Sequence, residues 1–257
     1  MRISVITPSY NQVAYLERAL RSVHEQEGPF EIEHWVIDGG STDGTVEMLE
    51  RWSDKLQYVS EADRGQSHAL NKGIERATGE IICWLNSDDL LLPGALAVVA
   101  DFFRTHAHVR WAYGRCLILD EHDREIRKPI TWYKNRLARR YSYTKLLVEN
   151  YISQQATFFT KELVDEAGGI DESLKYDMDY ELWLRFGLIC EPGILDADLG
   201  AFRFYAECKT GGDIDPTLRA AYEIAKKYAV KIDKPWLAAV NYVWYYKRTS
   251  WIYRLLA

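Results

Sequence analysis

Two adjacent carboxylates, Asp88 and Asp89, follow the apolar run at residues 80–85. Neighbouring carboxylates repel each other unless a cation lies beside or between them. Such a pair suits Mg²⁺ or Mn²⁺ held jointly with substrate phosphates, because both ions prefer hard oxygen ligands. The alternative is that one carboxylate caps the helix that we expect to open at Pro93. The pair taken alone leaves both interpretations open.

A second pair of carboxylates, Asp177 and Asp179, precedes an apolar run at residues 180–186 that fits a buried helix. A carboxylate at a helix N-terminus is stabilised in its ionised form. If it points into a crevice, it can accept the proton of a hydroxyl group as a general base. Capping of the helix is again the alternative.

Three further polar residues, Asp38, Asp63 and Arg64, stand where predicted strands end. A carboxylate there can accept hydrogen bonds from a ribose hydroxyl or a base N–H, and a guanidinium can bind a phosphate or a carbonyl. The alternative for the aspartates is turn chemistry, since Asp often bonds to its own backbone in loops. No GxGxxG motif follows the first strand, and no GxxxxGK motif appears, which argues against a dinucleotide-binding Rossmann domain and a P-loop.

The elements that must position these side chains alternate between strands and helices. Strands are predicted at residues 2–7, 32–38, 56–60 and 80–85, and helices at 14–26, 45–52, 66–77 and 93–104. This alternation predicts an α/β fold with a mostly parallel central sheet and helices on both faces. Ligands bind such sheets in the crevice beyond the carboxyl ends of the strands. The strand-end carboxylates are therefore expected to meet in one crevice.

The composition excludes several classes of protein. The 257 residues are 47% hydrophobic and 27% charged, which argues against a disordered or collagen-like chain. The four cysteines show no CxxC spacing, so we expect reduced thiols in a cytoplasmic protein. The N-terminal apolar run is too short for an export signal, and no uncharged stretch near the C-terminus reaches the roughly 18 residues that span a bilayer. We therefore expect a cytoplasmic protein that does not cross a membrane.

Several ordered motifs resemble those of the family 2 glycosyltransferases, which are inverting enzymes of the GT-A fold. The matching stretches are residues 4–11 (SVITPSYN), 36–45 (VIDGGSTDGT), 61–67 (EADRGQS) with Ala69, Asn71, Gly73 and Ile74, 86–89 (NSDD), 154–158 (QQATF) and 168–185. They extend from about residue 3 to residue 210. The resemblance implies a GT-A fold and transfer of a sugar from a nucleotide-sugar donor, with a UDP-sugar favoured, to a hydroxyl of a glycan or lipid-linked acceptor.

The resemblance also implies roles for residues on the donor side. The pocket for base and ribose would be lined by Thr7, Pro8, Tyr10 and Asp38. Asp63 and Arg64 would close this pocket. Asp89, assisted by Asp88, would bind the Mn²⁺ or Mg²⁺ that bridges the diphosphate, and Asp88 would also face the ribose or the donor sugar.

On the acceptor side, Asp179 aligns with the catalytic base of the family. It would remove the proton of the acceptor hydroxyl while the metal neutralises charge growing on the diphosphate. A single attack from the opposite face would invert the anomeric configuration. The residues expected near the donor sugar or the acceptor are Gln154, Gln155, Asp177, Trp183 and Arg185.

Two positions depart from the family pattern. Met178 stands where the family usually has Glu before the base, and Asp177 and Glu181 are the candidates to replace that carboxylate. Tyr205 stands where many relatives have a histidine that binds the metal, and Glu207 is the candidate to replace that ligand. These departures raise a rival function, a nucleotide-sugar-binding protein of the same fold that transfers nothing.

Two further functions are less well supported. A sugar nucleotidyltransferase usually opens with a glycine-rich, basic phosphate loop, and the segment that follows the first strand here, residues 8–12, contains neither Gly nor Lys or Arg. Nucleic-acid binding is disfavoured because the expected crevice is acidic.

The expected organisation is a catalytic domain at residues 1–215 and a helical tail at residues 216–257. The catalytic domain would divide into a nucleotide-binding half at about residues 1–105 and an acceptor half at about residues 106–215. The net charge is −6, yet residues 124–145 carry eight Lys or Arg against Glu125 alone, and residues 226–257 carry seven against Asp233 alone. Two basic segments on an acidic protein indicate an anionic ligand or surface at one place.

The tail at residues 234–257 mixes Trp and Tyr with Lys and Arg. In a helix, Leu237, Val240, Trp244 and Trp251 fall along one face. Aromatic rings beside basic residues suit a helix that lies in the headgroup region of an anionic membrane, here the inner face of the cytoplasmic membrane. The alternative is that the helix packs against the catalytic domain or against a second subunit in a homodimer.

Overall fold

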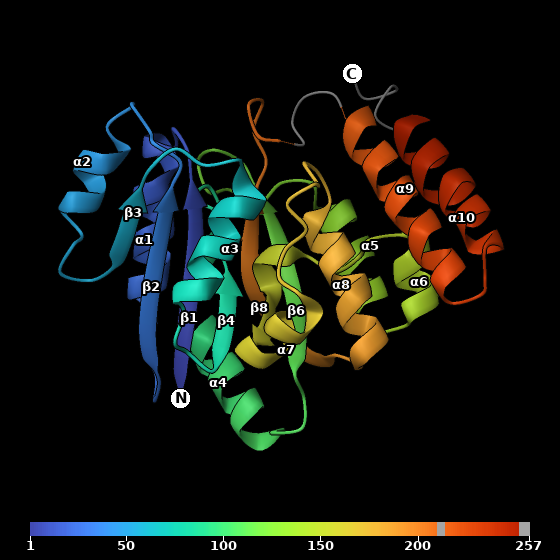
Figure 1. Ribbon diagram of the computed structural model, residues 1–257, viewed down its shortest axis with the longest axis horizontal. Helices are drawn as coiled ribbons and strands as arrows, with labels where there is room; N and C mark the ends of the chain where they lie inside the picture. The colour runs from blue at the N-terminus through green and yellow to red at the C-terminus, as the bar shows by residue number, and fades with distance from the viewer. Residues whose placement is uncertain (210–213, 252–257) are drawn as a thin grey trace.

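The centre of the fold is an eight-stranded sheet of strand order β3-β2-β1-β4-β7-β6-β8-β5. Figure 1 shows β3, β2, β1 and β4 side by side in one half of the sheet. The computed structural model describes residues 1–209 and 214–251. The strands are β1 (Arg2–Ser9), β2 (Glu31–Asp38), β3 (Gln57–Ser60), β4 (Ile81–Trp84), β5 (Leu90–Leu91), β6 (Trp111–Leu119), β7 (Thr157–Thr160) and β8 (Gly193–Arg203).

The half of the sheet made by β3, β2, β1 and β4 is parallel, as the alternation of strands and helices predicts. Strand β7 departs from this pattern, because it runs antiparallel to both β4 and β6. Its pairing aligns Cys83 with Phe158 and Ile81 with Thr160. The start of β7 therefore lies beside the carboxyl end of β4, which brings Gln154 and Gln155 to the edge where Asp88 and Asp89 stand.

Helices cover both faces of the sheet. They are α1 (Val13–His24), α2 (Thr45–Glu50), α3 (Gln66–Arg76), α4 (Ala95–Thr105), α5 (Lys128–Ala138), α6 (Tyr143–Val148), α7 (Lys161–Ala167), α8 (Met178–Ile189), α9 (Asp215–Lys231) and α10 (Trp236–Val240), with a 3₁₀ turn at Gln154–Ala156 and a π-helix at Asn241–Lys247. The helix expected to open at Pro93 begins two residues later, after Gly94, which has a φ of 77°.

Strand β4 shows how the sheet is buried on both sides. Ile81 and Cys83 belong to a cluster that includes residues of α1 and α4. Ile82 and Trp84 point the other way and join the larger cluster, which includes residues of α3 and of α5 to α10. All four side chains are at most 4% exposed. This burial explains why β4 reads as a continuous apolar run, and it fixes the direction in which the following Asn86–Asp89 segment leaves the sheet.

The C-terminal helices pack beside α6 and α8 (Figure 1). Leu237, one of the residues expected along one face of the tail helix, is 3% exposed, and Asn241 is fully buried with its amide donating to the carbonyl of Val148 at 2.9 Å. Trp244 and Trp251 remain 53% and 63% exposed. One face of the tail is thus packed on the protein, and another face carries indole rings that are exposed to solvent. The last part of the predicted tail, residues 252–257, lies outside the described residues.

Across the described part of the chain, no helix combines the length and the apolar character that crossing a bilayer requires.

Candidate active site

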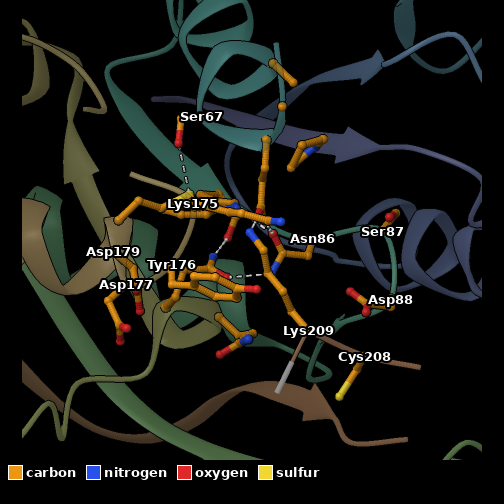
Figure 2. A pocket seen from close by; sticks show the side chains of 18 of the residues that line it. Ser67, Asn86, Ser87, Asp88, Lys175, Tyr176, Asp177, Asp179, Cys208 and Lys209 are labelled. Atoms are coloured by element: carbon orange, nitrogen blue, oxygen red, sulfur yellow. Dashed lines mark hydrogen bonds between the residues drawn. The ribbon is translucent and has the colours of Figure 1, made fainter. Parts of the chain in front are cut away.

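A cavity of about 1080 Å³ lies beyond the carboxyl ends of the parallel strands. Segments that follow β1, β2, β3 and β4 line one side of it, and residues 172–179 together with α5 line the other. Figure 2 shows Asp177 and Asp179 on one side of this cavity and Asp88 on the other, with Tyr176 and Lys209 between them. The cavity is therefore the crevice that the α/β pattern predicts.

One end of the cavity is built around Gly39. A Cβ atom added to Gly39 would lie 3.0 Å from Asp63 Oδ2 and 3.3 Å from Tyr10 Cδ2, so both side chains flank this glycine. Asp63 Oδ1 accepts a hydrogen bond from the Gly65 amide at 2.7 Å, which fixes the carboxylate. Tyr10 is 63% exposed and offers a ring face on which a planar ligand could stack. Pro8 lines the same end.

Arg64 also lines the cavity, and its guanidinium is held by Glu172, with Nη2 2.6 Å from Oε2. The pair connects the loop after β3 with the loop before α8. It ties the two sides of the cavity together at its rim.

Thr7 and Asp38 stand below the cavity wall and do not line it. The Thr7 hydroxyl contacts His34 Nε2 at 3.0 Å. Asp38 is fully buried, and its Oδ2 accepts from the amides of Gly40 and Ser41 at 3.1 and 2.9 Å and from the Ser60 hydroxyl at 2.6 Å. Asp38 is therefore used in turn chemistry, as the alternative interpretation has it, and it shapes the loop that carries Gly39.

The two adjacent aspartates have different environments. Asp88 lines the cavity, and its Oδ2 accepts a hydrogen bond from the Tyr205 hydroxyl at 2.8 Å. Asp89 is fully buried beneath it. Asp89 Oδ1 accepts from the Arg203 amide at 2.9 Å, and Oδ2 accepts from Gln155 Nε2 at 2.8 Å and Asn86 Nδ2 at 3.0 Å. Neither aspartate caps α4, because Gly94 is its N-cap and no side chain bonds there.

Burial raises the pKa of both carboxyls. The pKa of Asp88 is raised mainly by desolvation, against which the Tyr205 hydrogen bond acts. Desolvation and then the charge of Asp88 raise the pKa of Asp89 to about 7. Both shifts oppose ionisation, so a cation bound beside Asp88 would favour the charged form of the pair.

The side-chain oxygens available in the cavity fit a divalent ion that also binds phosphate. Among the described residues, no three His, Cys, Asp or Glu side chains converge as a ready ligand set. Asp88 and Glu207 both line the cavity. Mg²⁺ is usually held by one or two carboxylates together with substrate phosphates and water, and such a site needs no third protein carboxylate. Tyr205 offers a neutral hydroxyl, since desolvation raises its pKa far above the ordinary value.

Asn86 joins the two sides of the cavity floor. Its Oδ1 accepts from Gln66 Nε2 and from Trp84 Nε1, both at 2.7 Å, and its Nδ2 donates to Gln154 Oε1 at 3.0 Å. Gln154 in turn donates to the Trp84 carbonyl. Gln154 and Gln155 line the cavity, and their amide groups hold the Asn86–Asp89 loop in place.

Asp177 and Asp179 line the opposite wall. Asp177 has a φ of 54° and makes no side-chain cap to α8, and its Oδ2 is buried without a hydrogen-bond partner. Burial raises the pKa of both groups, and the charge of Asp179 raises that of Asp177 further. The amide of Tyr180 and the ammonium of Lys134 act in the opposite direction on Asp179. Burial thus raises the pKa of Asp179, and Tyr180 and Lys134 offset part of that rise. A carboxylate in such surroundings is suited to accept a proton.

Two residues that follow in α8 face away from the cavity. Trp183 is fully buried and stacks on Trp111 with ring centroids 5.9 Å apart. Arg185 pairs with Glu181 at 2.7 Å, and the other oxygen of Glu181 accepts from the Tyr228 hydroxyl at 2.5 Å. Their positions do not support the expected contacts of Trp183 and Arg185 with donor or acceptor, and Glu181 does not supply the carboxylate that Met178 lacks. Asp177 remains as its replacement.

The cavity also contains residues that the sequence did not single out. Those with side chains suited to ligand contact are Gln12, Lys134, Asn150, Tyr176 and Lys209. Lys134 belongs to the basic segment at residues 124–145, for which we expected an anionic ligand or surface. Lys134 is identified as part of the site only in the structure, where α5 lies at the rim of the cavity.

Comparison with known proteins identifies relatives of this chain. A family model described as glycosyl transferase family 2 matches residues 4–166. An uncharacterized glycosyltransferase of Mycobacterium tuberculosis is 34% identical over 197 residues, which cover 74% of this chain and 70% of that protein. The amylovoran biosynthesis glycosyltransferase AmsE of Erwinia amylovora is 27% identical over 74% of this chain and 71% of its own. A GalNAc(5)-diNAcBac-PP-undecaprenol beta-1,3-glucosyltransferase of Campylobacter jejuni is 33% identical over 47% of this chain and 40% of its own.

Two solved structures share the fold. S. aureus TarS 1–349 in complex with UDP-GlcNAc has a TM-score of 0.66 and 22% identity, over 90% of this chain and 66% of that one. The mannosyltransferase PcManGT from Pyrobaculum calidifontis in complex with GDP-Man and Mn²⁺ has a TM-score of 0.67 and 20% identity, over 94% of this chain and 73% of that one. The prediction of an α/β GT-A fold with a mostly parallel sheet and C-terminal helices is confirmed.

Proposed function

This chain belongs to glycosyl transferase family 2, and we propose that it transfers a sugar from a nucleoside-diphosphate sugar to an acceptor hydroxyl with inversion at the anomeric carbon. The observation that carries the proposal is the arrangement of the cavity. Asp88 lines one wall and Asp177 and Asp179 line the other, and the same cavity extends to Tyr10 and Asp63. Transfer from a nucleotide sugar needs a site that binds the nucleoside at one end and the diphosphate in the middle. It also needs a general base on the far side of the sugar.

In the proposed reaction, Asp179 accepts the proton of the acceptor hydroxyl. The hydroxyl oxygen forms a bond to the anomeric carbon while the bond from that carbon to the diphosphate oxygen breaks. The electron pair of the broken bond stays on the diphosphate, and the proton stays on Asp179. Attack from the side of Asp179 is opposite to the leaving group, so an α-linked donor gives a β-linked product. Lys134 supports the ionised form of Asp179 that this step requires.

Asp88, with Glu207, would hold a divalent cation against the donor diphosphate. Such an ion, Mn²⁺ or Mg²⁺, supplies positive charge where negative charge grows on the leaving group. Asp89 acts on this site through its neighbour. Its hydrogen bonds to Gln155, Asn86 and the Arg203 amide fix the backbone that carries Asp88. Tyr205 orients Asp88 from the other side.

At the nucleoside end, Tyr10, Gly39 and Asp63 would bind the base and ribose. Gly39 leaves the backbone open between the two flanking side chains, which lets a flat ring approach closely. We favour a UDP-sugar, as in the TarS complex with UDP-GlcNAc. The PcManGT complex with GDP-Man makes GDP-sugars the first alternative.

A panel of nucleotide sugars tests the proposal. Thermal unfolding is measured with each donor, with and without Mn²⁺, because a ligand at about 100 times its dissociation constant adds about 2.7 kcal/mol. We expect one donor to raise the Tm in a metal-dependent way. We expect the same donor to be consumed, either by transfer to an added acceptor or by hydrolysis. A donor that binds and is never consumed would support a binding protein of the same fold instead.

For the acceptor we propose a lipid-linked glycan used in polysaccharide synthesis. AmsE is named for amylovoran biosynthesis and the C. jejuni relative for an undecaprenol-linked acceptor. The exposed indoles of Trp236, Trp244 and Trp251 support contact with a membrane surface. We propose that this surface is the inner face of the cytoplasmic membrane, where such an acceptor would lie. Arg248 lies over the Trp244 ring at 4.7 Å, and its guanidinium is paired with Glu149 at 3.1 Å.

A further inference from the structure

We propose that Lys209 binds the diphosphate of the donor and stabilises the leaving nucleoside diphosphate, beside the divalent cation. This inference rests on the proposed function, because it names a side chain of the same site. Lys209 comes from the segment that follows Tyr205, and no motif marks it in the sequence. It would provide a cation that belongs to the protein itself, close to Asp88.

The position of the ammonium group is set by contacts on the donor side. Lys209 Nζ donates a hydrogen bond to Gln66 Oε1 at 2.8 Å. Gln66 in turn donates to Asn86 Oδ1 at 2.7 Å, three residues before Asp89. Lys209 Nζ also lies 5.7 Å from the centre of the Tyr176 ring. The side chain thus spans the cavity between the β8 side and the N-terminus of α3, over the floor that Asn86 forms (Figure 2).

Lys209 lies in a cavity lined by several carboxylates. A site for a diphosphate needs positive charge to balance the negative charge of the ligand. Asp88, Asp177 and Asp179 line the same cavity as Lys209, and so does Lys175. A donor diphosphate would bring further negative charge to the same place. In this partly desolvated cavity, an ammonium group interacts more strongly with a phosphate oxygen than it would in water.

The other cations that line the cavity have different positions. Arg64 is paired with Glu172 at the rim. Lys134 acts on Asp177 and Asp179 across the cavity from the donor side. Lys209 is hydrogen-bonded to a neutral amide, so an incoming phosphate oxygen can replace Gln66 as its acceptor without the loss of an ion pair. Tyr205, beside Asp88, contributes a neutral hydroxyl and no positive charge. Lys175 also lines the cavity and is therefore compared with Lys209 in the test.

The test compares Lys209→Met with Lys175→Met. Lys175 is a matched control, because it lines the same cavity and its Nζ is also 5.7 Å from the Tyr176 ring. Calorimetry gives the affinity of each full-length protein for UDP and uridine, and for GDP and guanosine, in EDTA and in Mn²⁺. Circular dichroism and Tm establish that each variant is folded.

We expect Lys209→Met to weaken the binding of the preferred nucleoside diphosphate at least tenfold in EDTA and to leave the nucleoside affinity unchanged. Lys209→Arg should restore part of the loss, and Lys175→Met should have a much smaller effect. Equal losses for the two lysine variants, or an equal loss for nucleoside and diphosphate, would overturn the inference while the proposed function stands. If the wild-type protein bound neither UDP nor GDP under any condition, the proposed function itself would fail, and the inference with it.

Discussion

The hydroxyl of Tyr205 donates a 2.8 Å hydrogen bond to Asp88 Oδ2, whereas Asp89, the next residue, receives its hydrogen bonds from Gln155, Asn86 and the Arg203 amide. We therefore propose separate tasks for the two carboxylates. Asp88 faces the cavity, where a metal and a diphosphate can reach it. Asp89 fixes the loop from beneath, a position that the adjacent pair in the sequence does not reveal.

Exchange of each aspartate for asparagine separates these tasks. Asp89→Asn places an amide N–H where three donors already converge, so we expect the free energy of unfolding to fall by about 1–3 kcal/mol. Asp88→Asn should change stability less and should abolish the Mn²⁺ dependence of nucleotide binding. Urea unfolding and calorimetry measure the two effects. If Asp89→Asn were fully stable and lost only metal-dependent binding, Asp89 would be the metal ligand, as the family motif suggests.

The base is tested by Asp179→Asn. We expect turnover to fall by about 10²–10⁴-fold, which corresponds to roughly 3–5 kcal/mol of barrier, with donor affinity nearly unchanged. Asp177→Asn is the matched control, because it removes the neighbouring carboxylate of the same wall. A mild effect of Asp179→Asn together with a severe effect of Asp177→Asn would assign the base to Asp177.

Acid sensitivity should arise in part from His34, which contacts Thr7 below the cavity wall. Burial, and then the neighbouring His24, lowers its pKa from 6.5 to about 3. His34 therefore stays neutral in the fold while it gains a proton in the unfolded chain, so stability present above pH 6.5 is lost as the pH falls toward 3. Replacement by Gln, which does not titrate, should make the Tm decline less steeply over this range. An unchanged slope would show that other groups dominate.

Membrane contact is best tested by substitutions in the full-length chain. Removal of residues 234–257 would also remove Leu237 and Asn241, which are buried, and would expose the core beneath them. Trp244→Ser and Trp251→Ser should instead weaken sedimentation with anionic liposomes without loss of Tm, and binding should decrease with salt. Val98→Ser, at an exposed apolar position on α4, is the control. A wild-type protein that stays in the supernatant at low salt would leave the tail with a packing role.

The sequence predicts the parallel half of the sheet well because its signals are local. Apolar runs and the turn residues between them identify β1 to β4, and the crevice rule then gathers Asp63, Asp88 and Tyr10 at one edge. Asp89 could not be interpreted in this way. Its partners Arg203 and Gln155 lie 114 and 66 residues further along the chain, and an antiparallel β7 is needed to bring Gln155 to it.

The same reason explains Trp183 and Lys209. The helical pattern around Trp183 predicts burial, yet its place in the motif suggested a ligand contact, and its stacking on Trp111 shows that burial prevails. Lys209 has no local pattern, and its side chain reaches the site only because β8 ends beside the Asn86 loop. Side chains that a distant strand delivers cannot be located from spacing alone.

The central claim is that this cavity transfers a sugar from a nucleoside diphosphate with Asp179 as the base. Its most direct measurement is the release of nucleoside diphosphate from a panel of UDP- and GDP-sugars with Mn²⁺ and glycan acceptors, with the anomeric configuration of the product determined by NMR. We predict release from one donor, a β-linked product from an α-linked donor, and a loss of release in Asp179→Asn that leaves donor binding intact. A product that retains the donor configuration, or full activity of Asp179→Asn, would contradict the account.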